Sequence, residues 1–317
     1  MAEQNITYSV VIPIFNEEKT VPELYRRLTD VMNGLEENYE IIFVDDGSKD
    51  LSLDLIQSFS TKDRHVKCVS LSRNFGHQIA ISAGIRFSGG RATILMDGDL
   101  QDPPEIIPSL VKKWEQGFEV VYAIRKKRKE NILKRFFYKL FYLILRKLSY
   151  IEIPLDTGDF SLIDKRVVDL LNSMPEKNRF IRGIRAWIGL KQIGVEYERE
   201  PRFAGTPKYS LRKLIALALD GIVSFSYWPL KLATKAGFFI SIASFLGGLF
   251  YFIYWLLRGD APKGFTTLAI LILLLAGIQF IMIGIMGEYI GRIHEEVKNR
   301  PLFIAKKLIG IEDTTYK

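Results

Sequence analysis

The sequence predicts an α/β protein with a mostly parallel sheet, followed by a hairpin of two membrane-spanning helices. Two observations lead to this fold class. In the first 125 residues, short runs rich in valine and isoleucine alternate with amphipathic helical patterns, which is typical of a parallel sheet covered on both faces. Beyond residue 232, two long stretches carry no formal charge. The chain of 317 residues is long enough for one large domain with such an appendage.

Five strands and four helices are expected in the first part of the chain. The predicted strands are YSVVIPI (8–14), YEIIFVDD (39–46), VKCVSL (66–71), ATILMD (92–97) and EVVYA (119–123). The amphipathic stretches between them lie at about 17–34, 51–61, 77–88 and 104–116. Ligands of open parallel sheets bind outside the carboxyl ends of the strands. We therefore expect a binding site where these strands end.

Polar and acidic side chains follow four of the predicted strands. They are Asn16 and Glu17 after the first strand, Asp45 and Asp46 after the second, Asn74 and His77 after the third, and Asp97, Asp99 and Gln101 after the fourth. Any one of them could cap the following helix, but four clusters at one sheet edge favour a site. No glycine-rich phosphate loop occurs in the sequence. A bound pyrophosphate would therefore have to be neutralised differently, and a divalent cation held by carboxylates can do this.

The segment LMDGDLQDPPE (95–105) offers ligands for such a cation. Because side chains alternate along an extended segment, Asp97, Asp99 and Gln101 are expected on one face. Two carboxylates and an amide oxygen in a row would suit Mg²⁺ or Mn²⁺. Asp102 falls on the opposite face, and we interpret it as the cap of the helix that the following Pro-Pro pair begins.

The two uncharged stretches are long enough to cross a membrane. One comprises 22 residues (236–257) and the other 24 (264–287). At about 1.5 Å per residue the shorter one spans about 33 Å, and a bilayer core measures about 30 Å. Buried core helices are the alternative, but they seldom stay apolar on every face for so long. We predict transmembrane helices at about 234–257 and 264–290.

Basic residues outside these spans predict the orientation of the hairpin. They are Lys231 and Lys235 before the first span, and Arg292, Lys298, Arg300, Lys306 and Lys307 after the second. By the positive-inside tendency, both outer ends are cytoplasmic. The N-terminal residues show no signal peptide, and the single cysteine, Cys68, fits a reducing compartment. We expect a multi-pass protein of the inner (plasma) membrane with both termini in the cytoplasm.

Two amphipathic segments are expected along the membrane surface. Between Arg125 and Lys147, ten basic residues and one acidic residue accompany an apolar helical stripe, which predicts a helix at about 131–150. A second stripe predicts a helix at about 210–230. Nucleic acid or a protein partner could bind such a basic helix, but beside two membrane spans we favour the bilayer and expect no nucleic acid.

Several motifs together resemble a known family. VVIPIFNEE, VDDGSKD, SRNFGHQIAISAG and DGDLQDPPE, in this order, resemble the family-two glycosyltransferases of GT-A fold, and more narrowly the polyprenyl-phosphate glycosyltransferases that include dolichol-phosphate mannose synthase. The resemblance continues through TGDFSLID (157–164), RFIRGIRAWIG (179–189) and REPRFAGTPKYS (199–210). The C-terminal spans, which end in GEYIGRIHEEVKNRPLF (287–303), resemble the bacterial two-span branch that includes polyprenyl-phosphate glucosyltransferases. The resemblance therefore covers nearly the whole chain.

The resemblance implies roles for individual residues. It implies a nucleotide-sugar pocket lined by Pro13, Phe15, Glu17, Asp46 and Asp97. It implies a metal-binding triplet of Asp97, Asp99 and Gln101. Asp159 matches a carboxylate proposed as catalytic base or acceptor-site residue. The positions that match phosphate-facing basic residues are Arg125, Arg202 and Lys208.

The implied domains follow the same order along the chain. We predict a nucleotide-sugar-binding GT-A core at 1–130, an acceptor-side region at 131–230, the two transmembrane helices within 232–292 and a cytoplasmic tail at 293–317. Apolar residues in that tail need a surface to dock on, which suggests a neighbouring protomer in a homo-oligomer, either a dimer or a tetramer.

The implied activity is the metal-dependent transfer of one sugar, with inversion, from a nucleotide sugar to polyprenyl phosphate. The absence of a Q-x-x-R-W motif favours single-sugar transfer over processive synthesis. UDP-glucose is our first choice of donor, with UDP-galactose, UDP-N-acetylglucosamine and GDP-mannose still open. A nucleotidyltransferase is an alternative, but PIFNEE after the first strand is no glycine-rich basic loop. A catalytically silent scaffold or flippase partner is another, which the intact Asp97, Asp99 and Asp159 oppose.

Overall fold

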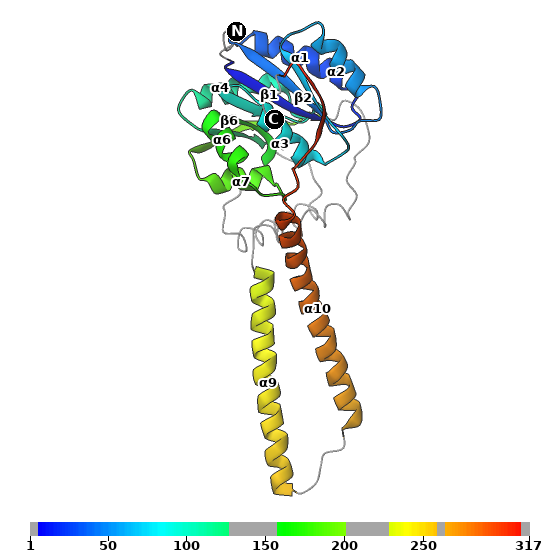
Figure 1. The fold of residues 1–317 in the computed structure, drawn as a ribbon. Coiled ribbons are helices and arrows are strands. Elements are labelled where there is room, and N and C mark those ends of the chain that lie inside the picture. The colour runs from blue at the N-terminus through cyan, green and yellow to red at the C-terminus, as the bar shows by residue number, and fades with distance from the viewer. Residues whose placement is uncertain (1–5, 127–156, 201–227, 259–263, 312–317) are drawn as a thin grey trace. The chain divides into compact units, whose positions relative to one another are not determined.

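The structure is a computed structural model of the chain (Figure 1). It describes residues 6–126, 157–200, 228–258 and 264–311. They fall into two compact units, one holding a sheet with its helices and the segment from Arg300 onward, the other holding two long helices. The predicted amphipathic helix at about 131–150 lies outside the described residues, as do Arg202 and Lys208. Of the one predicted at about 210–230, only residues 228–230 are described, and they begin the helix Trp228–Arg258.

One mixed sheet organises the first unit. Its strands, within the described residues, are β1 (Tyr8–Ile14), β2 (Tyr39–Asp45), β3 (Val66–Leu71), β4 (Ala92–Leu95), β5 (Val120–Arg125), β6 (Thr157–Asp164), β7 (Gln192–Tyr197) and β8 (Ala305–Ile309). Their order across the sheet is β7-β5-β6-β4-β1-β2-β3-β8. The pairs β1·β2, β1·β4, β2·β3 and β5·β7 are parallel, whereas β4·β6, β5·β6 and β3·β8 are antiparallel. The predicted mostly parallel α/β sheet is confirmed.

Helices cover both faces of this sheet (Figure 1). They are α1 (Val21–Asn33), α2 (Ser52–Ser60), α3 (His77–Phe87), α4 (Ile107–Trp114) after a 3₁₀ turn η1 (Pro104–Ile106), α6 (Lys165–Ser173) and α7 (Ile181–Ile188). Because strand side chains alternate, Val10 and Ile12 of β1 join one core with α1, α2 and α4. Val11 joins the opposite core with α3, α6 and α7. Because both faces of the sheet are covered, successive residues of a central strand are all buried, which explains the near-continuous apolar runs.

The strand order places a topological switch point beside β1. The chain runs outward from β1 through β2 to β3, and then returns to the other side of β1 to form β4. Open α/β sheets bind ligands at the carboxyl ends of strands where the order reverses in this way. The carboxyl ends of β1 and β4 are therefore where this fold is expected to carry its site.

The second unit consists of α9 (Trp228–Arg258) and α10 (Phe265–Val297). These helices contain two stretches long and apolar enough to cross a membrane, Leu230–Leu257 and Ile270–Val297. Their large apolar side chains are mostly exposed, as with Phe245 and Leu273. The predicted helices at about 234–257 and 264–290 thus form; α9 extends beyond both predicted ends, and α10 beyond its predicted C-terminal end.

The segment after α10 is part of the sheet. Strand β8 pairs antiparallel with β3, so that Cys68 faces Ile309 across the ladder. The amide of Ser72 donates a hydrogen bond to the carbonyl of Ile304 (2.9 Å). The prediction of a separate tail from residue 293 is therefore incomplete, because its apolar residues dock on the edge of the chain's own sheet.

Candidate active site

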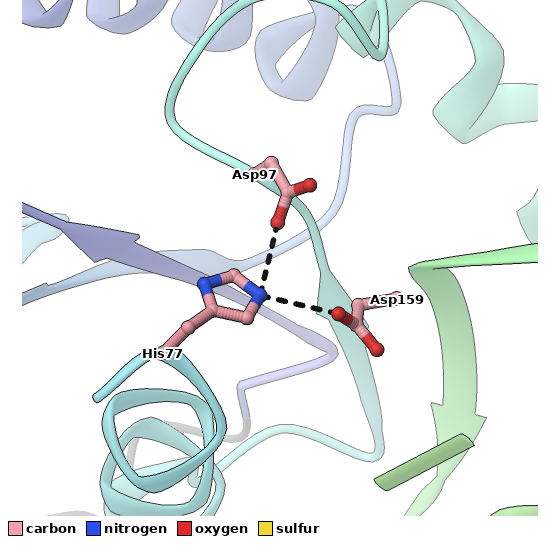
Figure 2. A group of neighbouring side chains, drawn as sticks. All are labelled: His77, Asp97 and Asp159. Carbon is pink, nitrogen blue, oxygen red and sulfur yellow. Dashed lines mark hydrogen bonds and ion pairs between the residues drawn. The ribbon is translucent and has the colours of Figure 1, made fainter. Parts of the chain in front are cut away.

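Three side chains from distant parts of the chain converge at the carboxyl end of β4. Figure 2 shows the imidazole of His77 between the carboxylates of Asp97 and Asp159. Its Nε2 lies 3.1 Å from Asp159 Oδ2 and 3.4 Å from Asp97 Oδ1. His77 begins α3 and Asp97 follows β4. Because β6 runs antiparallel to β4 and pairs Ser161 with Leu95, the start of β6 brings Asp159 to this edge.

Asp159 is the most heavily bonded member of this cluster. Its side chain is 2% exposed. Arg182 donates to both carboxylate oxygens, from Nε to Oδ1 (2.7 Å) and from Nη2 to Oδ2 (3.0 Å). The amide nitrogen of Gln78 donates to Oδ2 (3.1 Å), while its amide oxygen accepts from the backbone nitrogen of Ile181 (2.9 Å). Asp159 is thus fixed in orientation by α3 and α7 together.

The charges in the cluster shift its pKa values in opposite directions. Burial raises the pKa of Asp159, but Arg182 and His77 outweigh burial and hold that pKa well below its usual range. Burial disfavours the charged imidazole of His77, yet the hydrogen bond to Asp159 and the two carboxylates raise its pKa to about 9. Burial raises the pKa of Asp97 to about 6, against the attraction of His77. Asp159 is therefore a poor proton acceptor.

The cluster has the donors for a divalent cation. One ligand atom from each of His77, Asp97 and Asp159 lies within 4.8 Å of the others. Asp97 Oδ1 is buried and has no hydrogen-bond partner among the described residues, although the side chain as a whole is 23% exposed. A buried carboxylate oxygen that accepts no hydrogen bond, and whose charge partner is the imidazole of His77 at 3.4 Å, suits a hard cation such as Mg²⁺ or Mn²⁺. Asp97 therefore fits the predicted metal, whereas the oxygens of Asp159 are already bonded to Arg182 and the raised pKa of His77 favours the imidazolium, which has no free lone pair for a metal.

The segment after Asp97 differs from the prediction. Strand β4 ends at Leu95 rather than at residue 97, and residues 98–102 form a turn in which Leu100 has a φ of +57°. Asp99 Oδ1 accepts a hydrogen bond from the backbone nitrogen of Gln101 (3.1 Å). The expectation of one extended row is wrong because a left-handed residue redirects the chain. The roles of Asp99 and Gln101 as metal ligands stay predictions, and Asp99 lies outside the cluster of His77, Asp97 and Asp159.

The interpretation of Asp102 as a helix cap is also wrong. The residue that caps η1 is Pro103, with no side-chain hydrogen bond. Asp102 is fully buried and accepts a hydrogen bond from the hydroxyl of Tyr197. The guanidinium groups of Arg125 and Arg199 lie 3.8 Å and 3.6 Å from its carboxylate oxygens. A buried carboxylate is stable only when it is paired and hydrogen-bonded, and Arg125, Arg199 and Tyr197 supply these partners to Asp102.

Arg125, predicted to face phosphate, is the last residue of β5 and is largely buried. Its side chain is 13% exposed. Its Nε donates to the hydroxyl of Tyr197 (3.2 Å), and a Cβ on Gly158 would lie only 2.8 Å from its Nη2. Arg125 therefore contacts the backbone next to Asp159 as well as Asp102. A phosphate-binding role for it stays a prediction.

Asp46 holds the loop that leads into α3. Its carboxylate accepts hydrogen bonds from the backbone nitrogens of Phe75 (2.7 Å) and Gly76 (3.0 Å). Burial raises its pKa, and these two bonds oppose the rise. Gly47 has a φ of +72°, and a Cβ there would lie 2.8 Å from the backbone of Arg73 and Asn74. The loop after β2 thus packs closely on the loop that positions His77.

We expect Asp46→Asn to destabilise the sheet domain, because an amide N–H would face a backbone N–H. The loss of one charge-assisted hydrogen bond predicts a decrease of about 1–3 kcal/mol in the free energy of unfolding. Displacement of His77 should also raise KM for the nucleotide-sugar donor that the resemblance implies. Thermal unfolding and donor titration measure both effects. Asp63→Asn is the matched control, because Asp63 also accepts a backbone hydrogen bond, from His65 (2.9 Å). If Asp46→Asn leaves KM for the donor unchanged, Asp46 does not position His77 for donor binding.

The remaining predicted pocket residues lie at the carboxyl end of β1. Pro13 is buried within β1, and Phe15 and Glu17 follow it. The backbone nitrogen of Glu17 donates to Ser52 Oγ (2.9 Å), which ties the loop after β1 to the start of α2. In the adjoining turn, the backbone nitrogen of Asn16 donates to Ser48 Oγ (3.0 Å). The structure brings these residues to the predicted edge, and their contact with a nucleotide stays a prediction.

Sequence reasoning missed three residues of the site. Gln78 and Arg182 bind Asp159, and Tyr197 binds Asp102. Arg182 stands within RFIRGIRAWIG, a stretch that the family resemblance marked without assigning it a role. Trp187 of the same helix is 64% exposed near the helix end, two residues before Gly189 with a φ of +70°.

The fold and the site together define a GT-A-like glycosyltransferase, with acidic side chains at the switch point of a mostly parallel sheet. Residues 9–171 match the family Glycosyl transferase family 2, and residues 228–293 match the GtrB C-terminal hairpin. The chain belongs to glycosyltransferase family 2. It is therefore an enzyme of that class rather than a nucleotidyltransferase.

Relatives are similar over nearly their whole length. The uncharacterized glycosyltransferase YkcC of Bacillus subtilis (strain 168) is 47% identical, over 98% of this chain and 96% of the relative. The uncharacterized glycosyltransferase sll0501 of Synechocystis is 45% identical, over 97% of each chain. The bactoprenol glucosyl transferase of Shigella phage SfII is 42% identical, over 94% of this chain and 97% of the relative.

Solved structures support the fold. Glucosyl-3-phosphoglycerate synthase from Mycobacterium tuberculosis, in complex with phosphoglyceric acid, has a TM-score of 0.50 at 22% identity. The alignment covers 69% of this chain and 78% of that one. At this identity the likeness shows the fold alone.

Proposed function

We propose that this protein transfers one glucose, with inversion, from UDP-glucose to polyprenyl phosphate at the cytoplasmic face of the plasma membrane. One observation supports the proposal above all. The same chain has the cluster of His77, Asp97 and Asp159 at the switch point of its sheet and a C-terminal hairpin that matches the GtrB family. Relatives at 40–42% identity are named as bactoprenol glucosyl transferases or their homolog. Bactoprenol is a polyprenyl alcohol, so its phosphate is the acceptor that we infer.

The acceptor brings its own nucleophile. An oxygen of the lipid phosphate forms a bond to the anomeric carbon of glucose, and the bond from that carbon to the pyrophosphate breaks, so that UDP leaves with the electron pair. A phosphate monoester has a second pKa of about 6 and is mostly dianionic at neutral pH. It therefore hardly needs a general base. This agrees with an Asp159 whose pKa lies well below its usual range and whose oxygens are bonded to Arg182.

Asp159 and its partners would act by orientation. Arg182 and Gln78 hold the carboxylate at fixed distances of 2.7–3.1 Å. A carboxylate held in this way can accept hydrogen bonds from a sugar or align the acceptor, because its geometry does not change when a substrate arrives. We assign Asp159 to orienting the acceptor or the sugar.

Asp97, with Asp99 and Gln101, would hold the cation. Hard cations prefer oxygen ligands, and Asp97 Oδ1 is buried without a hydrogen-bond partner among the described residues. A bound Mg²⁺ or Mn²⁺ would neutralise charge that develops on the leaving diphosphate. His77 would act as the charge partner of Asp159 rather than as a ligand. Pro13, Phe15, Glu17 and Asp46 are proposed to form the surrounding nucleotide-sugar pocket.

The membrane supplies the acceptor. We propose that α9 and α10 span the bilayer with their outer ends in the cytoplasm, which follows from the basic residues flanking them. Arg202, Lys208 and Arg125 are the cations proposed to bind the acceptor phosphate. Assembly into a homo-oligomer stays a prediction.

A transfer assay tests the proposal. The full-length protein, purified in lipid nanodiscs, is given UDP-glucose and undecaprenyl phosphate with Mn²⁺ or Mg²⁺. We expect UDP release and a glucosylated lipid only when the acceptor is present, and loss of both with a chelator. UDP-galactose, UDP-N-acetylglucosamine and GDP-mannose tested in parallel decide the sugar. Equal UDP release without the lipid phosphate, or an absence of glycolipid with every donor, would overturn the proposal.

A further inference from the structure

We propose that Asp102 is a positioning residue that holds the turn carrying Asp97, Asp99 and Gln101 in its cation-binding shape. The inference deepens the proposed function and rests on it in one respect, namely that this turn binds a metal–nucleotide complex. Asp102 touches neither His77 nor Asp159 in the contacts of the described residues. Its charge acts directly on Asp97 through space, and the effect on the shape of the site that we propose is transmitted through the turn.

The turn is fixed firmly at its first end. The backbone nitrogen of Met96 donates to the carbonyl of Val11 (3.1 Å), which continues the pairing of β4 with β1. A Cβ on Gly98 would lie 2.6 Å from Ile14 Cδ1 and 3.2 Å from the carbonyl oxygen of Pro13, so this part of the turn lies directly on β1. Asp97 thus receives its position from the sheet.

The second end of the turn depends on Asp102. Leu100 adopts a φ of +57°, a conformation that is unfavourable for a non-glycine residue and persists only where neighbouring contacts enforce it. Two contacts flank it. The amide of Glu200 donates to the carbonyl of Gln101 (3.1 Å), and the hydroxyl of Tyr197 donates to Asp102 Oδ1.

Both contacts lead to the segment that leaves β7. Tyr197 is the last residue of β7, and Arg199 and Glu200 follow it. Arg27 strengthens the connection, since its guanidinium pairs with Glu105 (2.6 Å) and with Glu200 (3.1 Å). Asp102 therefore joins the turn to the end of β7, the strand at one edge of the sheet.

Asp102 is also linked to Asp159 through Arg125. The guanidinium of Arg125 lies 3.8 Å from Asp102 and close against Gly158, the residue before Asp159. Asp102 Oδ2 is buried and forms no hydrogen bond among the described residues, so Arg125 and Arg199 balance its charge. One buried carboxylate thus sets the spacing between the proposed metal turn and the strand that carries Asp159.

The test measures metal binding and local exchange on the full-length protein. Groups that orient metal ligands typically change metal affinity by about 10–100-fold when they are removed. We expect Asp102→Asn to weaken binding of Mn²⁺ with UDP by at least about tenfold on this basis. Hydrogen exchange at the amides of Gln101 and Glu200 should become faster. Tyr197→Phe should change both measurements in the same direction by a smaller factor.

Matched controls separate positioning from general destabilisation. Glu40 is a buried carboxylate at the amino end of β2, held by Ser9 (2.5 Å), Gly89 (2.7 Å) and Lys67 (2.5 Å). The hydroxyl of Tyr39, a buried tyrosine, donates to Asn33 (2.9 Å). Glu40→Gln and Tyr39→Phe should lower the unfolding temperature while Mn²⁺ affinity and exchange at Gln101 stay at wild-type values.

The outcomes are distinguishable. Wild-type Mn²⁺ affinity and exchange in Asp102→Asn would overturn the inference, as would an equal loss of affinity in Glu40→Gln. If Asp102→Asn does not fold, Tyr197→Phe decides between the same outcomes. If the wild-type protein binds no Mn²⁺ with UDP, the proposed donor is wrong, and the exchange measurement still decides whether Asp102 holds the turn.

Discussion

Asp97→Asn is expected to abolish sugar transfer while leaving the fold intact. Asp97 follows β4 at the switch point, and its Oδ1 is buried without a hydrogen-bond partner among the described residues. The change therefore removes the charge of a proposed metal ligand, and with it the ion pair of that oxygen with His77 (3.4 Å). Losing metal stabilisation of several kcal/mol in the transition state corresponds to a decrease in kcat of about a thousandfold or more. Glycolipid formation at saturating UDP-glucose measures it, with circular dichroism to confirm folding.

Two companion variants decide which residues complete the metal site. We expect Asp99→Asn to lose Mn²⁺ affinity as strongly as Asp97→Asn does. His77→Gln should retain that affinity, since we propose that His77 is a charge partner of Asp159 and no ligand. The reverse pattern would assign the cation to the cluster of His77, Asp97 and Asp159, which lie within 4.8 Å of one another. Transfer by Asp99→Asn in the presence of a chelator would exclude the predicted set altogether.

Asp159→Asn is expected to lower kcat by about 10²–10³-fold, with little change in KM for UDP-glucose, because a misaligned reacting group can cost about this much. Arg182 would lose its bidentate partner, and the hydrogen bond that raises the pKa of His77 would weaken. The pH profile of the residual activity should keep the acidic limb of the wild type. The carboxylate is ionised far below neutral pH, so it does not set that limb.

Asp164→Asn is the matched control on the same strand. Asp164 accepts a hydrogen bond from Trp114 Nε1 (2.8 Å) and caps α6 through the amide of Arg166 (2.9 Å), at the end of β6 away from Asp159. It should lower stability without changing the pH profile. If the acidic limb vanishes only in Asp159→Asn, Asp159 removes a proton in the reaction, and the orienting role is wrong.

Strands with uninterrupted apolar runs were predictable from sequence. β1 and β3 have the predicted bounds, because burial on both faces leaves few polar residues to blur the pattern. β6 contains Gly158 and Asp159, so no apolar periodicity marks it, and only the family resemblance drew attention to it. The antiparallel direction of β6, which brings Asp159 to the site, depends on pairing with β4 that a single sequence does not reveal.

The contacts of the site were less predictable than its location. Alternation along an extended chain placed Asp99 and Gln101 beside Asp97, but the left-handed Leu100 cannot be read from hydrophobic periodicity. The partner of Asp159, Arg182, lies 23 residues further along the chain, and Asp102 meets Tyr197 across 95 residues. Such pairs arise from tertiary packing. The sequence shows that charged residues are present, and the fold decides which of them meet.

The return of strand β8 to the edge of the sheet has a practical consequence for dissecting this enzyme. Its residues are encoded after the apolar hairpin, so a water-soluble fragment that simply stops before α9 would lose the strand that covers β3. The exposed backbone of β3 would then be free to pair with other chains, a common origin of insoluble protein. A useful fragment should replace the hairpin by a flexible linker and keep residues 300–311.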